Sequence, residues 1–285
     1  MKPAAFEYHA PATVDDAVAL LAEVAPDGGR VLAGGQSLVP TMAFRLAQPP
    51  HLVDINGIAG LDRIEEAGGR LVIGALARHA AFHAPVAEGP LGPLMAEMAR
   101  HIGHAPIRAR GTFTGSLAQA DPASEWVLLA VTLGASVTAQ SIRGSREIAA
   151  ADLIQGAMTT ALTEDELLTE ACVPLPAEGT HFGFAEFNRR AGDFALAMAL
   201  AAYRIEDGKI TDARIGIGGA EDRPRRIGQA EAALDGAAPG APAFEAAARA
   251  VAEALDPMED HATDAAYRRE LAAALTIRAL KRAQP

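Results

Sequence analysis

The chain has 285 residues, of which 50% are hydrophobic, so it can bury a large core in two domains or subdomains. Its formal net charge of −11 argues against nucleic acid or an anionic membrane as an electrostatically bound partner. A single cysteine, Cys172, excludes a disulfide framework, a thiolate zinc site or an iron–sulfur cluster held by this chain alone.

The N-terminal residues predict a small α/β unit. Thr13, followed by two acidic residues, is typical of a helix N-cap, and the apolar spacing after it predicts a helix to Val24. A short strand over 29–32 then leads through a Gly-Gly turn into a short helix over 38–46. A second strand is expected over 51–55.

A second α/β unit is predicted up to the prolines near residue 176. Ala67-Gly68-Gly69 is typical of a hairpin turn, and Ser124 is a candidate N-cap. Residues 111–118 are expected to be irregular or extended. The other expected elements are helices over 76–83, 91–102 and 124–133, and strands over 62–66, 70–73, 135–141, 146–148 and 167–173.

The C-terminal part of the chain predicts an antiparallel sheet followed by alanine-rich helices. Asp207-Gly208 is typical of a tight hairpin turn. A run of strands followed by a run of helices indicates an α+β layer rather than alternating βαβ units. The strands are expected over 181–187, 195–206 and 209–218, and the helices over 227–234, 243–255 and 264–282.

The segment after the 29–32 strand, Ala33-Gly34-Gly35-Gln36-Ser37, begins with three residues that lack bulky side chains. Glycines allow φ > 0 and let a ligand approach the backbone, and successive N–H groups before a helix can cradle a phosphate. For one Gly-Gly pair, an ordinary strand-to-helix turn is the simpler interpretation. No G-x-G-x-x-G or P-loop pattern occurs here, so those nucleotide sites are disfavoured.

A second stretch of the same character runs from Gly111 to Pro122, with two threonines, a serine and Asp121. Two such loops, brought together by the fold, could enclose a pyrophosphate from both sides. An acidic residue beside them could bind ribose or ribityl hydroxyls. Two unrelated turns remain an alternative on the chemistry alone.

Together the two stretches resemble the paired FAD signatures of the flavoprotein (medium) subunits of molybdenum hydroxylases, a family similar to carbon monoxide dehydrogenase medium subunits and the FAD domain of xanthine dehydrogenases. The order and spacing of the motifs agree over nearly the whole chain. The matching segments are Ala33-Gly34-Gly35-Gln36-Ser37-Leu38, Ile73-Gly74-Ala75, His101-Ile102-Gly103-His104, Gly111-Thr112-x-x-Gly115-Ser116-Leu117-Ala118-x-Ala120-Asp121-Pro122, Arg189-Arg190-x-x-Asp193-Phe194-Ala195 and Ile217-Gly218-Gly219.

The resemblance implies an α+β architecture. A two-subdomain, vanillyl-oxidase-like (PCMH-type) FAD-binding domain is expected over residues 1–176, with subdomains of about 1–56 and 57–176. A smaller C-terminal domain with an antiparallel sheet and helices is expected over 177–285.

The resemblance also implies the cofactor contacts. Residues 32–38 would wrap the pyrophosphate of FAD, residues 112–116 would close on it from the other side, and the others would contact other parts of the cofactor. No catalytic residue and no metal ligand is nominated. The expected FAD-binding residues are Leu32, Ala33, Gly34, Gly35, Gln36, Ser37, Leu38, Gly103, Thr112, Thr114, Gly115, Ser116, Asp121 or Glu125, and Leu168.

Two positions depart from the family pattern. Thr114 stands where a glycine is usual, so this position needs less backbone freedom or its hydroxyl replaces a contact. Glu186 stands where some relatives carry a lysine, so a cationic partner for the flavin ring is not expected there. His101 and His104 could both face a metal, but no third ligand is near in the sequence and packing is favoured.

The implied function is that of an oxidoreductase subunit. A large molybdopterin subunit would hydroxylate the substrate, a small subunit with [2Fe–2S] clusters would pass the electrons on, and FAD in this chain would deliver them to an external acceptor. The resemblance also implies a heterotrimer of these large, medium and small subunits. A cytoplasmic location is expected by default, because the chain shows no signal peptide or apolar run of membrane-spanning length. The alternatives are a self-sufficient flavin oxidoreductase and a non-catalytic assembly protein with a decayed flavin site.

Overall fold

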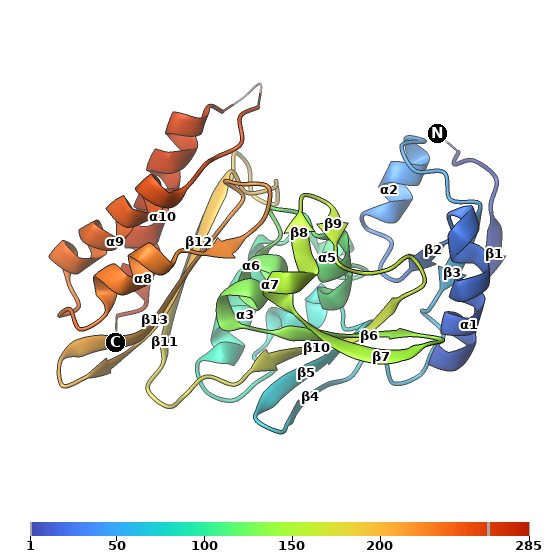
Figure 1. Ribbon diagram of the computed structural model, residues 1–285, viewed down its shortest axis with the longest axis horizontal. Helices are drawn as coiled ribbons and strands as arrows, with labels where there is room; N and C mark the ends of the chain where they lie inside the picture. Colours follow the sequence, from blue (N-terminus) through green and yellow to red (C-terminus); the bar gives the residue numbers. More distant parts are fainter. Residues whose placement is uncertain (1, 261–262, 285) are drawn as a thin grey trace.

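The computed structural model describes residues 2–260 and 263–284. Three layered parts follow one another along the chain, each built around its own sheet (Figure 1). A small parallel sheet lies at the N-terminal end, a larger antiparallel sheet lies in the centre, and a third sheet with its helices lies at the C-terminal end. Within the described ranges no helix combines the length and apolar character that crossing a bilayer requires.

The N-terminal sheet has the strand order β1-β3-β2, and both pairs are parallel. Thr13 caps the first helix as predicted, because its side chain accepts a hydrogen bond from the Asp16 N–H at 3.1 Å. Ala17, Leu21 and Val24 on that helix pack against Val53 of the sheet. The elements are β1 (Glu7–His9), α1 (Val14–Val24), η1 (Ala25–Asp27), β2 (Arg30–Leu32), α2 (Leu38–Ala43) and β3 (His51–Asp54).

The central sheet has the order β4-β5-β10-β6-β7 and is antiparallel throughout. The buried α6 packs with α3 and α5 beside it, and Trp126 lies fully inside this core. Ser124 caps α6 as expected by accepting from the Val127 N–H at 3.4 Å. The elements are β4 (Ile64–Ala67), β5 (Arg70–Gly74), η2 (His79–His83), α3 (Leu91–His101), α4 (Ala105–Arg108), α5 (Phe113–Gln119), α6 (Glu125–Leu133), β6 (Ser136–Ser141), β7 (Gly144–Ala149), α7 (Ala150–Leu153), β8 (Ile154–Gly156), β9 (Thr159–Thr160) and β10 (Leu167–Pro174).

Two expectations in this region are wrong. Residues 113–119 form a helix and not an extended segment, because the Thr112 side chain caps it and its apolar residues are buried, which outweighs the weak helix propensity of glycine and threonine. The helix expected over 76–83 is only a 3₁₀ turn from His79. The backbone before it is bonded elsewhere: Leu76 N–H donates to the Leu61 carbonyl, and the Ala77 carbonyl accepts from Phe113 N–H.

The C-terminal sheet has the order β11-β12-β13-β14 and carries helices on both faces (Figure 1). Helices α8 to α10 cover one face, and α6 of the central part packs against the other. Contact with α6 is close at Gly216, where a Cβ would lie 1.8 Å from the Thr132 hydroxyl oxygen. The elements are β11 (His181–Phe187), β12 (Ala197–Glu206), β13 (Lys209–Gly218), β14 (Arg225–Arg226), α8 (Gly228–Leu234), α9 (Ala241–Ala254) and α10 (Ala265–Arg282).

Candidate functional site

The first glycine loop, residues 33–37, connects β2 to α2. Gly35 has φ +73°, which side-chain-bearing residues rarely adopt, and its carbonyl accepts from the Val39 N–H at 3.0 Å. Gln36 folds back and donates from Nε2 to the Gly34 carbonyl at 3.2 Å. The N–H groups of residues 34–37 donate to no other described residue. Successive unpaired N–H groups can bind an anion.

The second glycine loop, residues 110–116, leads into α5. The Thr112 hydroxyl accepts from the Gly115 N–H at 3.1 Å, and its carbonyl accepts from the Ser116 N–H at 3.1 Å. The N–H groups of Thr112 and Thr114 donate no hydrogen bond within the described ranges. This loop therefore also offers backbone donors to a ligand.

The two loops touch each other through their backbones. A Cβ on Gly34 would lie 2.5 Å from the Arg110 carbonyl oxygen and 2.7 Å from the Gly111 Cα. Real Cβ atoms do not approach other heavy atoms so closely, so only glycine allows this contact. The fold thus brings together the two segments that the sequence pairs, across more than seventy positions of the chain.

Asn56 and Arg78 hold this junction together, although neither was nominated from the sequence. Asn56 Nδ2 donates to the Ala33 carbonyl at 2.8 Å. The half-buried Arg78 donates from Nη2 to Asn56 Oδ1 and from Nη1 to the Arg110 carbonyl, so it bonds to both sides. Burial lowers the Arg78 pKa, and the neighbouring Arg110 acts in the same direction. An asparagine just after the strand expected over 51–55 and an isolated arginine carry no motif signal.

An aromatic cluster supports the second loop from behind. Trp126 donates from Nε1 to His79 Nδ1 at 3.0 Å. The ring centroids of Phe82 and Phe113 each lie 5.1 Å from that of Trp126. Desolvation lowers the pKa of His79 to about 4, with Arg78 and Arg108 acting in the same direction. His79 is therefore a neutral packing residue here. It also faces Gly111, where a Cβ would lie 2.5 Å from its Nε2 atom.

Three acidic side chains gather at the start of α6. Burial raises the pKa of the Glu125 carboxyl to about 8, with Glu186 and Asp121 acting in the same direction. Burial also raises the Asp121 pKa, although its Oδ1 accepts from the Ala123 N–H at 2.9 Å. Glu186, whose side chain is 1% exposed, has Oε2 3.5 Å from His101 Nδ1. The residue that replaces a lysine therefore faces Glu125 and His101.

The remaining predicted residues lie around the loops. Leu168 of β10 is buried in the core cluster that also contains Leu117 and Trp126. The Gly103 carbonyl accepts from Arg108 Nη1 at 2.7 Å, just before the second loop. Among the predicted cofactor-binding segments, the structure shows close backbone contact between the two glycine loops. The positions of Gly103, Asp121, Glu125 and Leu168 relative to a bound cofactor stay predictions.

Thr114 has a buried hydroxyl whose Oγ1 has no hydrogen-bond partner among the described residues. Its exposed fraction is 2%, so water does not compensate the oxygen either. An unsatisfied buried hydroxyl costs about 1–3 kcal/mol, which a ligand oxygen could offset. The residue that departs from the family glycine thus adds an unused polar group to the second loop.

Replacing Thr114 with valine is expected to change two quantities in opposite directions. The cofactor-free chain should gain up to about 1 kcal/mol in free energy of unfolding, because an unsatisfied hydroxyl is removed. If the Thr114 hydroxyl binds a cofactor oxygen, affinity for FAD should fall about tenfold in the variant. Urea unfolding and quenching of flavin fluorescence measure the two effects. Thr114→Ser, which keeps the hydroxyl, is the matched control, and weaker unfolding stability in Thr114→Val would contradict the prediction.

Comparison with known proteins covers the whole chain. Residues 4–176 match the model of the FAD binding domain in molybdopterin dehydrogenase, and residues 182–283 match the CO dehydrogenase flavoprotein C-terminal domain. The nicotine 6-hydroxylase medium subunit of Paenarthrobacter nicotinovorans is 39% identical, with 98% of each chain covered. The caffeine dehydrogenase subunit beta of Pseudomonas sp. (strain CBB1) is 37% identical, with 99% of this chain and 96% of the relative covered.

A solved structure shows the same architecture. The matched chain of carbon monoxide dehydrogenase from Hydrogenophaga pseudoflava superposes with a TM-score of 0.94 at 37% sequence identity, with 99% of this chain and 98% of the other covered. The α+β class and the order of FAD-binding part and C-terminal part are thereby confirmed. The exact domain boundary at residues 176 and 177 stays a prediction.

Proposed function

The chain belongs to the family of FAD-binding medium subunits of molybdenum hydroxylases, and from this we propose that it is the electron-transfer flavoprotein of a heteromeric complex. A large subunit with a molybdopterin centre and a small subunit with [2Fe–2S] clusters would be its partners. FAD, when bound, supplies the redox chemistry, and this chain supplies binding, orientation and electrostatics. Substrate choice would then belong to the large subunit.

One observation carries the cofactor assignment: the backbone contact between the two glycine loops, with unpaired N–H groups on both. Backbone donors placed on two sides suit a pyrophosphate, because each N–H offers a hydrogen bond to a charged oxygen. Residues 32–38 would hold it on one side, and Thr112, Thr114, Gly115 and Ser116 would hold it on the other. The fit supports the proposed site.

The other nominated residues would bind the remainder of FAD. Asp121 or Glu125 would accept hydrogen bonds from its hydroxyls, and Gly103 and Leu168 would line the bound cofactor. Glu125 would be protonated at neutral pH, because burial raises its pKa to about 8. A neutral carboxyl can donate a hydrogen bond as well as accept one.

Arg78 is expected to contribute to FAD affinity without contacting the cofactor. Arg78→Leu removes both bonds that join Asn56 to the Arg110 carbonyl, so the loops should separate and FAD binding should weaken about tenfold. Equilibrium titration with FAD measures the change. Arg63→Leu, which removes a more exposed arginine bonded to Glu170, is the matched control. Equal affinity in parent and Arg78→Leu would show that the junction does not position the loops.

The proposed function is tested by purifying the chain with its partners. We expect a yellow protein that co-purifies with iron- and molybdenum-containing subunits, and reduction of its FAD only when the iron–sulfur partner is present. Reduction by an organic substrate without any partner would identify a self-sufficient flavin enzyme and overturn the proposal. A colourless chain that also fails to bind added FAD would indicate an assembly protein instead. A cytoplasmic location stays a prediction from the sequence.

A further inference from the structure

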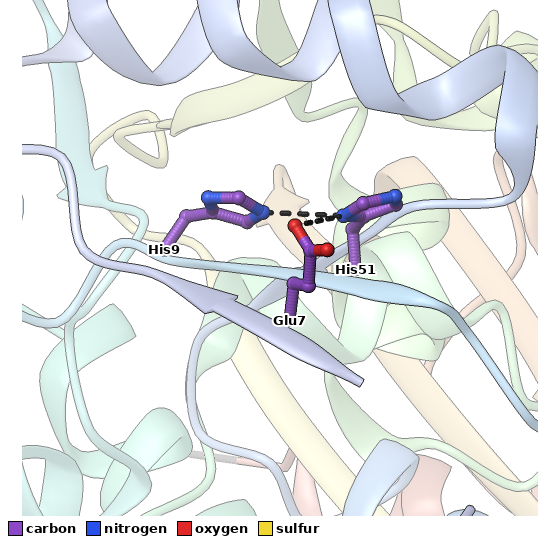
Figure 2. A group of neighbouring side chains, drawn as sticks. All are labelled: Glu7, His9 and His51. Atoms are coloured by element: carbon purple, nitrogen blue, oxygen red, sulfur yellow. Dashed lines mark hydrogen bonds and ion pairs between the residues drawn. The ribbon is translucent and has the colours of Figure 1, made fainter. Parts of the chain in front are cut away.

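Glu7, His9 and His51 form a cluster on the N-terminal sheet, away from the glycine loops. Glu7 and His9 belong to β1, and His51 is the first residue of β3. The two strands are parallel neighbours, with Glu7 paired directly to His51. Side chains alternate between the faces of a strand, so Glu7 and His9 lie on the same face as His51. Figure 2 shows both rings directed toward each other with the Glu7 carboxylate beside them.

The distances in this cluster match those between ligands of one small cation. His9 Nε2 lies 3.2 Å from His51 Nδ1, and Glu7 Oε2 lies 3.6 Å from that same His51 atom. The three ligand atoms all lie within 4.8 Å of one another. In a tetrahedral zinc site with bonds of 2.0–2.2 Å, neighbouring ligand atoms are about 3.3–3.6 Å apart. Only a small movement of Glu7 would complete the set.

We propose that Glu7, His9 and His51 form a binding site for Zn²⁺ or a similar transition-metal ion. Two imidazole nitrogens and one carboxylate oxygen are a common zinc ligand set, and water would take the fourth position. Imidazole ligands favour zinc, copper or nickel, whereas magnesium and calcium prefer oxygen ligands. The site is at the surface, where Glu7 is exposed, so an ion can enter from solvent.

The metal would fasten the short β1 to β3. The strand β3 ends at Asp54, and Asp54 Oδ1 accepts from the Asn56 N–H at 2.9 Å. Asn56 in turn holds the Ala33 carbonyl of the first glycine loop. On the opposite face the Tyr8 hydroxyl donates to Asp54 Oδ2 at 2.6 Å. The ion would therefore bind on the face of the sheet opposite to the Tyr8–Asp54 hydrogen bond.

Binding should weaken as the pH falls. Zinc binds neutral imidazole and ionised carboxylate, so protons compete with the metal for all three ligands. Without metal, one ring nitrogen donates and the other accepts across the 3.2 Å contact.

The test is calorimetric titration of ZnCl₂ into the full-length chain, free of any affinity tag and treated with a chelator. We expect one Zn²⁺ per chain with a micromolar or tighter Kd, and no heat from MgCl₂. His9→Ala, His51→Ala and Glu7→Gln should each weaken binding at least about 100-fold, because loss of a direct ligand exceeds the 10–100-fold effect of an outer partner. His181→Ala, in the C-terminal sheet, is the matched control and should bind as the parent does.

X-ray absorption at the zinc edge provides the second readout, with two nitrogen neighbours and a carboxylate oxygen expected. The proposal is overturned if the parent binds no zinc below millimolar concentration, or if the three variants bind as tightly as the parent. Titration with and without FAD separates this proposal from the function proposed above, because neither result depends on the other.

Discussion

Gly34→Ala is expected to abolish FAD retention by the purified protein. The added Cβ would lie 2.5 Å from the Arg110 carbonyl oxygen and 2.7 Å from the Gly111 Cα, and both obstacles are backbone atoms. Neither can move aside as a flexible side chain could, so the two glycine loops must separate. If the loops bind the pyrophosphate as proposed, loss of two hydrogen bonds to a charged group, about 1.5–3 kcal/mol each, should lower affinity by at least about 100-fold.

Flavin absorbance of the purified chain and titration of the cofactor-free chain with FAD measure this effect. Gly57→Ala is the matched control, because Gly57 is an exposed neighbour of the site and a Cβ there would meet nothing within 4 Å. The control should retain FAD at the level of the parent. Stoichiometric FAD in Gly34→Ala with unchanged affinity would show that the loop contact does not shape the binding site.

Glu125→Gln is expected to remove a pH dependence from the stability of the chain. The carboxyl has an ordinary pKa of 4.5, and burial raises its pKa to about 8 in the folded state. The folded chain therefore holds a proton that the unfolded chain releases between these values. Its stabilising contribution is complete below pH 4.5 and is lost as the pH rises through about 8.

The loss approaches about 1.4 kcal/mol per pH unit and totals a few kcal/mol across this window. Glutamine stays neutral, so the free energy of unfolding of Glu125→Gln minus that of the parent should grow from pH 5 to about pH 8 and level off above it. Urea unfolding followed by fluorescence of Trp126, the single tryptophan, measures it.

Taking the difference between variant and parent removes the contribution of groups that do not interact with Glu125. His79 is one of them: its pKa falls from 6.5 to about 4 on folding, so its contribution is present above pH 6.5 and is lost as the pH falls through about 4. Glu23→Gln, at an exposed site on α1, is the control and should run parallel to the parent. Parallel curves for Glu125→Gln would mean that the buried carboxyl is not protonated in the folded chain.

Local patterns predicted most elements of the fold well. The strands His181–Phe187 and Lys209–Gly218 agree with the structure at both ends, and Asp207-Gly208 forms the expected turn with φ of 50° and 74°. Alternation of side chains and turn chemistry act over a few neighbouring residues, so they are visible in the sequence. The prediction of an irregular or extended segment over 111–118 was wrong, because burial and a cap at Thr112 outweighed poor helix propensity.

The functional site was likewise predicted only in part from the sequence. The order of the motifs assigned the chain to a family and predicted that the two glycine loops act together. It did not indicate Asn56 or Arg78, whose side chains join the loops. The effect of Glu186 on Glu125 could not be predicted either, because it depends on how α6 packs against the C-terminal sheet.

By itself, the sequence determined the α+β class, the order of the two parts, the FAD-binding family and the paired loops. Each of these depends on local composition or on the order of motifs along the chain, and both can be read from the sequence. Only the tertiary structure decided that Gly34 touches Arg110, that Glu125 is buried against Glu186, and that Glu7 and His9 lie against His51. Such contacts arise from strand register and helix packing, which bring together residues that no local pattern relates.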